Sequence, residues 1–483
     1  MLILAPETTY QPIFPMAFTK TLEETAAAVA ALLPEFQAIF GDRAVTSAAV
    51  RAHHSHGEGL PDPGQPDVVL FPLTNEEVAA AARLCHDAVV PIIAFGSGTS
   101  MEGHVAAIHG GVCIDLSRMD RILDVSTEAM DCRVQAGVTR EQLNEHLRAS
   151  GLFFAVDPGA NASLGGMAST RASGTAAVRY GTMRETVMGL TVVTPDGRIV
   201  RTGTRARKSA SGFDLTRLYV GSEGLLGIIT EVQLRLFGLP EHVVAAVVQF
   251  DTLRAAMDTV IATLQLGIPV ARIELLNDVQ MDACIRYSKL DEFEARPTLF
   301  VEFHGSESTV TEQVETVQAV AADNGGSGFR YAHLPEERSR LWKARHSCYH
   351  ANLAMRPGWS SMGTDACVPI SALVDCITET EADILESGLY APIVGHVGDG
   401  NFHLGIIYDD SDHAARQKAE ALAERVALRA IRLGGTCTGE HGVGLHRIGQ
   451  IEIEHGEAID LMKDLKRALD PMGIMNPGKM LRM

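Results

Sequence analysis

The sequence contains no apolar run of about 18 or more residues, and this absence argues against a transmembrane helix. It also contains no C-x-x-C pair: its 8 cysteines are scattered, several of them in apolar settings such as GGVCIDL and DACVPI. Free, reduced thiols in a cytosol-like compartment fit this distribution. The first residues match neither a secretory signal nor an arginine-rich transit peptide. We therefore expect a cytoplasmic protein, or one that is peripheral to the inner face of a membrane.

The sequence has fewer basic residues than acidic ones. Lysine and arginine total 41 against 60 aspartates and glutamates, for a net charge of -19. A surface of this sign repels phosphate backbones and anionic lipid, so no nucleic-acid partner is expected. The same charge would allow docking to a basic electron-transfer protein, although an acidic balance is also an ordinary solvated surface.

The length of 483 residues indicates two or three domains. Capping signatures at Thr74 and Thr139 open two helices within a mixed pattern of helices and strands. After Pro240 the strand-like runs VVAAVVQF, ARIELL and PTLFVEF alternate with helical stretches, which predicts an antiparallel sheet backed by helices. The predicted class is α+β, in four parts: an arm and helix (1–44), a first domain (45–240), a second domain (241–435), and a C-terminal segment (436–483) that packs back on the first domain.

Three tracts of glycine and other small residues lie in the first domain: FGSGTSMEGH from Phe95, DPGANASLGGMASTRASG from Asp157, and GSEGLLGII from Gly221. The first tract is neither a G-x-G-x-x-G fingerprint nor a Walker motif, and alone it is explained equally well by a tight turn or an anion-binding nest. Three such tracts together imply close backbone approach to something bulky. A dinucleotide would fill the space that such small side chains leave.

The order of PIIAFGSGTSMEGH, DPGANASLGGMASTRASG, RYGTMRE and GSEGLLGIITE resembles the FAD-binding domain of the vanillyl-alcohol oxidase / p-cresol methylhydroxylase superfamily. The resemblance implies that residues 95–100 cradle the pyrophosphate, while 158–174 and 221–229 line the adenosine and isoalloxazine. Some members attach FAD through a histidine in the first loop, which here has none before His104, so we expect non-covalent FAD. The cofactor contacts implied are Phe95, Gly96, Ser97, Gly98, Thr99, Ser100, Pro158, Gly159, Ser163, Gly165, Gly166, Ser173, Gly174, Gly181, Glu223, Gly227, Ile229 and Asn476.

Two histidines, His396 and His403, flank a glycine-rich turn in HVGDGNFH, and Glu440 and His441 are adjacent in TGEHGVG. Each histidine taken alone could be a buried structural residue. Two neutral imidazoles and one carboxylate are, however, a common ligand set for a divalent metal with an open coordination position.

The pairing of HVGDGNFH with TGEHGVG, followed by NPGK, is similar to the C-terminal domain of the FAD-linked 2-hydroxyacid dehydrogenases. By this resemblance His396, His403 and Glu440 hold Zn²⁺ or Mn²⁺, and His441 is the base. Arg345 is a candidate clamp for the substrate carboxylate, although a solvated helix arginine is the alternative. Asp365 and Asp399 are expected to support neighbouring backbone.

The chemistry implied is oxidation of a 2-hydroxy acid, in which the hydroxyl loses a proton and the Cα hydride goes to flavin N5. Gly363 and Gly405 stand where the hydroxyglutarate branch of the family has a lysine and an asparagine, so we expect a short substrate, D-lactate, with glycolate or D-2-hydroxyglutarate as alternatives. The expected acceptor is cytochrome c, a quinone or an electron-transfer flavoprotein, and a homodimer is an expected assembly. A metal hydrolase and a non-catalytic flavin subunit are the rival interpretations.

Overall fold

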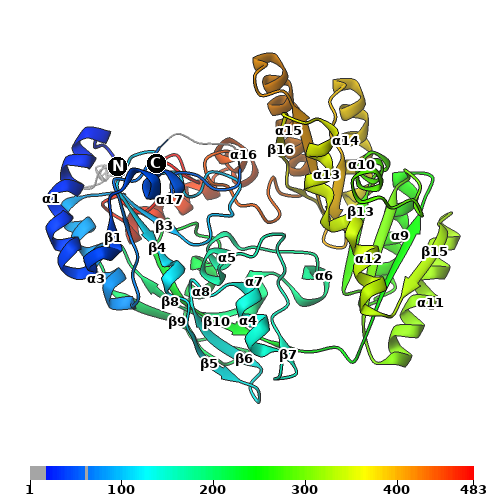
Figure 1. Ribbon diagram of the computed structural model, residues 1–483, viewed down its shortest axis with the longest axis horizontal. Coiled ribbons are helices and arrows are strands. Elements are labelled where there is room, and N and C mark those ends of the chain that lie inside the picture. The colour runs from blue at the N-terminus through cyan, green and yellow to red at the C-terminus, as the bar shows by residue number, and fades with distance from the viewer. Residues whose placement is uncertain (1–17, 60–63) are drawn as a thin grey trace, which may run out of the picture.

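The computed structural model describes residues 18–59 and 64–483. Two lobes lie side by side, and the C-terminal helices return to the lobe that holds the N-terminal helices (Figure 1). The arm predicted over residues 1–20 falls almost entirely outside the described residues. In the part of the chain that is described, no helix is both long and apolar enough to cross a membrane.

The first lobe contains a four-stranded sheet in the order β1-β2-β4-β3, in which β2, β4 and β3 run parallel. Its strands are β1 (Ala44–Val45), β2 (Val68–Leu70), β3 (Ile92–Phe95) and β4 (Val112–Asp115). Helices α1 (Leu22–Phe40) and α3 (Asn75–Ala88) contribute to the hydrophobic core beside this sheet. The Thr74 side chain accepts a hydrogen bond from the Glu77 N–H, which confirms the predicted start of α3.

A second sheet in this lobe is antiparallel, in the order β5-β6-β10-β8-β9. Its strands are β5 (Ile122–Ser126), β6 (Asp131–Gln135), β8 (Val187–Val193), β9 (Ile199–Gly203) and β10 (Ile228–Arg235), and a two-stranded ribbon joins β7 (Leu152–Phe153) to β11 (Phe237–Gly238). Short helices surround it: α2 (Ala48–His53), α4 (Arg140–Leu147), α5 (Leu164–Thr170), α6 (Ala177–Tyr180), α7 (Met183–Thr186) and α8 (Leu215–Tyr219). The predicted capping box at Thr139 opens α4.

The second lobe contains an antiparallel sheet in the order β15-β12-β14-β13-β18-β19-β16, with β17 paired to β19. Its strands are β12 (His242–Gln249), β13 (Arg272–Leu276), β14 (Thr298–Gly305), β15 (Ser327–Ala332), β16 (Ser360–Gly363), β17 (Ala366–Cys367), β18 (Ile393–His396) and β19 (Asn401–Tyr408). This architecture confirms the predicted α+β class.

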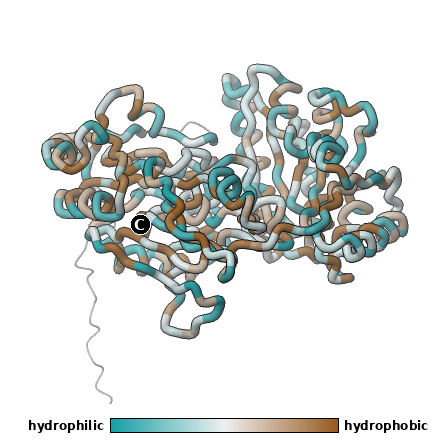
Figure 2. Tube along the Cα trace, turned by 60° about the horizontal axis from the view of Figure 1, so that its bottom comes forward, coloured by the Kyte–Doolittle hydropathy of each residue, from teal (hydrophilic) through white to brown (hydrophobic). Residues whose placement is uncertain are grey.

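Helices cover both faces of this sheet. Successive side chains of a strand point to opposite faces, and here the side chains on both faces are apolar. Val244, Ala246 and Val248 pack with α9 (Leu253–Gln265), α11 (Glu307–Asp323), α14 (Leu373–Ser387) and α15 (His413–Arg432). Ala245 and Val247 face the opposite way, toward α10 (Asp278–Ser288), α12 (Pro335–His346) and α13 (Cys348–Met355). Along the outer helices hydrophobic and hydrophilic positions alternate as this packing requires (Figure 2).

The C-terminal segment returns to the first lobe through α16 (Ile448–His455), α17 (Ala458–Leu469) and the last residues of the chain. The backbone N–H of Ile92 donates to Ile474, and that of Asn476 donates back to Ile92, which adds the segment to the edge of β3. Lys466 is buried in α17, and its ammonium donates to Asp470 and to the carbonyls of Leu225 and Met475. Burial lowers the pKa of Lys466, although Asp470 partly opposes that shift.

The substitution Lys466→Met is expected to lower the free energy of unfolding by about 3–5 kcal/mol, because it leaves Asp470 buried without its cation. Lys463→Met on the same helix is the control, since the Lys463 ammonium lies 4.0 Å from its nearest carboxylate. We expect that control to change stability by less than about 0.5 kcal/mol. Equal denaturant midpoints for the two variants would contradict the role given to Lys466.

Candidate functional site

A cavity of about 1830 Å³ extends between the lobes and is lined by residues from all three small-residue tracts and from both histidine motifs. Sites for drug-sized ligands span about 300–1,000 Å³, so this cavity has room for a dinucleotide together with a small substrate. Of the residues predicted to contact the cofactor, those that line the cavity are Phe95, Gly96, Ser97, Gly98, Thr99, Ser100, Pro158, Gly159, Ser163, Gly165, Gly166, Ser173, Gly174, Glu223, Gly227, Ile229 and Asn476.

The wall formed by the first two tracts has the character of a ligand cradle. The side-chain oxygens of Ser100 and Ser163 are buried, and neither has a hydrogen-bond partner among the described residues. A Cβ added to Gly96 would lie 2.3 Å from the Ser163 Oγ, so a larger residue there would occupy the cradle. Buried hydroxyls normally find partners, so these two oxygens suit a polar ligand such as the FAD phosphates.

Three predicted cofactor residues have structural roles of their own. Gly181 does not line the cavity; it ends α6, and its φ of 79° favours glycine. The Glu223 carboxylate accepts hydrogen bonds from the backbone N–H groups of Val443 and Gly444, at 2.7 and 2.9 Å. The Asn476 amide donates to the Glu223 carbonyl oxygen. Glu223 and Asn476 therefore hold the C-terminal segment against the cofactor wall.

The two predicted metal histidines lie on a β-hairpin. His396 ends β18, His403 lies in β19, and the tight turn between them depends on Gly400, whose φ is 78°. A Cβ on Gly400 would lie 2.0 Å from the Val368 carbonyl oxygen, so the turn admits no larger residue. The hairpin brings the two rings to a centroid separation of 5.4 Å.

Both rings point at one carboxylate oxygen. The Nε2 atoms of His396 and His403 lie 3.2 and 3.3 Å from the same Oε1 of Glu440. Two donors of one tetrahedral zinc ion, each about 2.1 Å from it, are separated by about 3.4 Å. The Glu440 oxygen therefore stands at ligand-to-ligand distance from each predicted histidine ligand. Among the described residues, however, the most compact group of potential donors is Asp365, His403, Glu440 and His441, and it leaves out His396.

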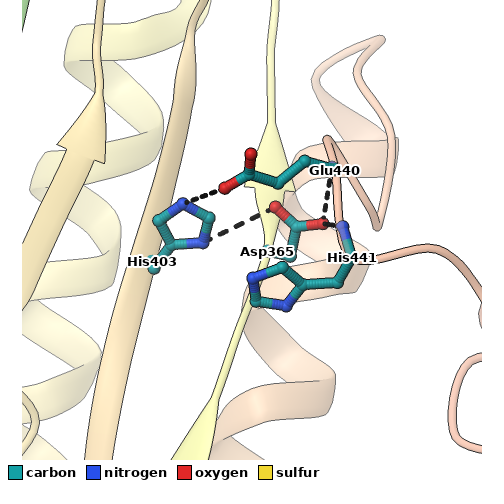
Figure 3. Close-up of side chains that lie close together, drawn as sticks. All are labelled: Asp365, His403, Glu440 and His441. Atoms are coloured by element: carbon teal, nitrogen blue, oxygen red, sulfur yellow. Dashed lines mark hydrogen bonds and ion pairs between the residues drawn. The ribbon is translucent and has the colours of Figure 1, made fainter. Parts of the chain in front are cut away.

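Hydrogen bonding on the far side of each ring determines which nitrogen carries the proton. The His403 Nδ1 donates to the Thr364 carbonyl at 2.9 Å, so in the neutral ring Nε2 presents a lone pair to Glu440. Figure 3 shows the contact between His403 and the Glu440 carboxylate. The His396 Nδ1 donates to the Glu274 carboxylate at 2.8 Å, with the same consequence. Imidazoles oriented in this way by a second partner are typical of metal ligands.

The close contacts around Glu440 shift the pKa values of the groups that make them. Burial alone would raise the pKa of Glu440, but His396 and His403 hold it well below the ordinary value. Burial would likewise lower the pKa of His396, but Glu274 and Glu440 raise it well above the ordinary value. Two lone pairs that face a carboxylate oxygen repel it, so the contact requires a proton or a cation among the three groups.

Asp365 fixes the loop that carries Glu440 and His441. Its Oδ2 accepts hydrogen bonds from the backbone N–H groups of both residues, each at 2.8 Å, and from the Thr438 hydroxyl at 2.7 Å (Figure 3). Its Oδ1 accepts from Asn401, in the hairpin. This support of backbone was the role predicted for Asp365. The aspartate also lies close enough to His403, Glu440 and His441 to count among four potential metal donors.

His441 lies directly beside the candidate metal site. Its ring stacks on that of His403, with centroids 5.1 Å apart and an angle of 9° between the planes. Its Nδ1 lies 3.4 Å from a Glu102 oxygen but forms no hydrogen bond in the described structure. Burial lowers the pKa of His441, while Asp365 and Glu102 raise it, and the net shift is upward.

Arg345 lines the cavity, and its Nε donates to Glu274 at 2.7 Å. The arginine is therefore partly buried and paired, unlike the solvated helix arginine that was the alternative interpretation. Because Glu274 also accepts from His396, one carboxylate orients both the arginine and a candidate metal ligand.

Sequence reasoning missed Glu274 and Glu102. Glu274 belongs to the apolar strand run ARIELL and is buried, and a charged residue in such a run was the available signal. Glu102 lies within the first glycine tract and pairs with Arg447 at 2.6 Å. Burial raises the pKa of Glu102, but Arg447 and His441 more than offset that effect, and the pKa lies well below the ordinary value.

Comparison with known proteins gives a consistent result. Residues 239–480 match the family model described as FAD linked oxidases, C-terminal domain, and residues 66–203 match the model of an FAD binding domain. A probable mitochondrial D-lactate dehydrogenase of Danio rerio is 50% identical over 95% of this chain and 93% of its own length. A mitochondrial D-lactate dehydrogenase [cytochrome] of Arabidopsis thaliana is 47% identical over 86% of this chain and 73% of its own.

Among solved structures, p-cresol methylhydroxylase with bound substrate superposes with a TM-score of 0.75, at 17% identity, over 94% of this chain and 97% of its own. This likeness confirms the predicted type of fold. The predicted cytoplasmic location, in contrast, is wrong: both relatives are mitochondrial proteins by name, and the absence of a recognisable transit peptide was a poor guide.

Replacing Asp365 by asparagine is expected to lower the free energy of unfolding by about 2–4 kcal/mol, because a charged acceptor of several hydrogen bonds is lost. The matched control is Asp399→Asn in the hairpin turn. Burial raises the pKa of Asp399 to about 7, so loss of its charge near neutral pH should cost less than about 1 kcal/mol. Urea unfolding of both variants tests this difference, and a control that is as destabilised as Asp365→Asn would refute it.

Proposed function

Because the chain belongs to the FAD-linked oxidase family, with an FAD-binding domain ahead of the family's C-terminal domain, we propose that it is an FAD-dependent D-lactate dehydrogenase. The reaction proposed is the oxidation of D-lactate to pyruvate. FAD is held without a covalent bond in this proposal, since the first tract has no histidine before its last residue, His104, which lies 3.3 Å from Glu223. The residues on the small-residue wall of the cavity supply the FAD site.

One observation carries this proposal. His396, His403 and Glu440 converge within the same cavity that the small-residue tracts line. Their donor set of two imidazoles and a carboxylate fits Zn²⁺ or Mn²⁺, and the opposed lone pairs at Glu440 fit a bound cation. A metal hydrolase would not need the tracts, and a flavin subunit without activity would not need the three ligands together with His441.

Each group has a defined task in this proposal. When bound, FAD would supply the hydride acceptor for the substrate Cα. His396, His403 and Glu440 would hold a metal ion that would supply Lewis acidity toward the substrate hydroxyl. His441, stacked on His403, accepts the hydroxyl proton at its ring nitrogen. Arg345 binds the substrate carboxylate through the guanidinium N–H groups that Glu274 leaves available.

The space beside His403 supports a short substrate. Gly363 in β16 pairs with Gly405 in β19, and Gly405 lies two residues from His403 on β19. A Cβ at Gly405 would lie 3.0 Å from the Asn352 amide nitrogen, and one at Gly363 would lie 3.4 Å from the Met101 methyl carbon. The side chains closest to these two glycines, Asn352 and Met101, carry no charge that could bind a distal carboxylate. The electron acceptor stays a prediction: cytochrome c, a quinone or an electron-transfer flavoprotein. The homodimer also stays a prediction.

Mixing the oxidised holoprotein with D-lactate under anaerobic conditions is expected to bleach the flavin absorbance. L-lactate should bleach it far more slowly, since the opposite configuration directs the Cα hydrogen away from the flavin. Glycolate and D-2-hydroxyglutarate serve as further comparisons in the same stopped-flow measurement. A higher kcat/KM for D-2-hydroxyglutarate than for D-lactate would contradict the substrate assignment, and a colourless purified protein would contradict the flavin.

The metal assignment predicts separate effects for two adjacent residues. Glu440→Gln should weaken the affinity for the metal ion by more than roughly 10–100-fold, the loss that follows changes in residues that only support the metal ligands. His441→Ala should retain both metal and FAD, yet slow flavin reduction by about 10²–10⁴-fold, as expected for loss of a general base.

Elemental analysis, flavin absorbance and rapid-reaction kinetics on the two variants separate these effects. Wild-type protein treated with a chelator should behave like Glu440→Gln and recover with added Zn²⁺ or Mn²⁺. Full activity in metal-free protein would exclude the role given to the ion, and an unchanged rate in His441→Ala would exclude the base.

A further inference from the structure

Two of the eight free cysteines lie in contact beside the substrate end of the cavity. The sulfurs of Cys284, in α10, and Cys348, at the start of α13, are 3.9 Å apart. Cys348 lines the cavity, whereas Cys284 is fully buried behind it. A small reagent in the cavity therefore reaches Cys348 first, with a second thiol already next to it.

We propose that Cys284 and Cys348 form a redox-active dithiol, which a hydroperoxide entering the cavity oxidises to an internal disulfide that displaces Arg345. One sulfur takes the terminal oxygen of the hydroperoxide, whose O–O bond breaks, and the rest leaves as water or an alcohol. The other sulfur attacks the resulting sulfenic acid, and water leaves as the S–O bond breaks. In total the two thiols lose two electrons and two protons, which the hydroperoxide accepts.

The surroundings of the pair favour the second step, the attack by Cys284. The Gln280 amide donates to the Cys284 sulfur at 3.4 Å, which stabilises a thiolate at that position. The pKa of Cys284 lies below its ordinary value, first because of the hydrogen bond with Cys348 and further because of Gln280 and Arg345, whereas burial raises that of Cys348. A thiolate at Cys284 is the nucleophile that the second step requires.

Closure of the bond requires movement near the proposed substrate clamp. A disulfide is about 2.05 Å long, so the sulfurs must approach each other by roughly 1.9 Å. Cys348 lies just after the junction between α12 and α13, where Ser347 ends one helix and precedes the next. Arg345 is three residues away on the same junction, and Asn352 in α13 is held to Gln280 in α10 by a reciprocal pair of amide hydrogen bonds. Movement of the junction therefore shifts Arg345 relative to the cavity.

The loss of activity rests on the proposed role of Arg345, whereas the formation of the disulfide does not. A misplacement of about 1 Å at a substrate-positioning group can lower a rate by about 10²-fold. We expect oxidation to lower kcat/KM for D-lactate by about that factor, with FAD still bound, and a reductant to restore it.

The experiment treats holoprotein with hydrogen peroxide, blocks free thiols by alkylation, and digests it without reductant for mass spectrometry. A cross-linked peptide pair containing Cys284 and Cys348 is expected, together with a fall in flavin reduction by D-lactate that dithiothreitol reverses. Phenylarsine oxide bridges two neighbouring thiols with loss of water and no redox change. One molecule is expected to bind per protein chain.

Cys284→Ala is the test variant, since its side chain lies outside the cavity lining and basal activity should be kept. It should form no cross-link, bind no phenylarsine oxide and show no reversible loss of activity. Cys376→Ala, which removes a buried thiol from α14, is the matched control and should respond as wild type.

Absence of the cross-link in wild-type protein, or reversible inhibition that persists in Cys284→Ala, would overturn the proposal. A cross-link without loss of D-lactate oxidation would overturn the effect on Arg345. A protein that forms the cross-link but never reduces its flavin with D-lactate, even before oxidation, would instead count against the proposed function alone.

Discussion

The site depends on one electrostatic arrangement: the Nε2 atoms of two imidazoles face a single oxygen of Glu440. Such an arrangement is repulsive in a buried setting unless positive charge lies among the groups. The protein enforces it from outside. Thr364 and Glu274 take the far nitrogens of the two rings, while Asp365 holds the backbone of Glu440 and His441. Thr364 and Glu274 thus favour a cation without lying among the potential donors, whereas Asp365 is itself one of them.

Buried carboxylates couple this arrangement to the rest of the molecule. Glu274 joins His396 to Arg345, so the proposed metal ligand and the proposed substrate clamp share one support. Glu102 lies near His441 and pairs with Arg447, and Glu223 accepts from the backbone of Val443 and Gly444. Glu102 and Glu223 belong to the first lobe and contact the C-terminal segment, so packing of that segment on the first lobe also places Glu440 and His441 at the cavity.

The same coupling explains why a thiol pair outside the metal site matters to the substrate. Cys348, Arg345 and Asn352 lie along one helix junction, and Gln280 contacts both Cys284 and Asn352. Polar contacts in a close-packed interior transmit small displacements instead of absorbing them. A decrease of about two ångströms in the distance between the two sulfurs therefore displaces Arg345, the proposed carboxylate clamp.

Much of the fold could be predicted from the sequence because its signals are local. The capping residues Thr74 and Thr139 begin helices where predicted, and the alternating run of β12 forms a strand with two buried faces. The turn at Gly400 was visible because only glycine tolerates its backbone angles. Motif identity also indicated the family, since the glycine tracts and histidine motifs occur in a specific order.

What the sequence by itself determined was therefore the start of two helices, the antiparallel sheet of the second lobe, the family, and the three candidate ligands. Only the tertiary structure showed that Glu274 orients Arg345 and His396, and that Glu102 lies beside His441. It also showed that Gly181 lies away from the cavity and that Glu223 serves the C-terminal segment. The reason is physical. Propensity and turn chemistry act between neighbours in the chain, whereas the proton on a ring nitrogen and the partner of a buried carboxylate depend on contacts between residues that the chain brings together from far apart.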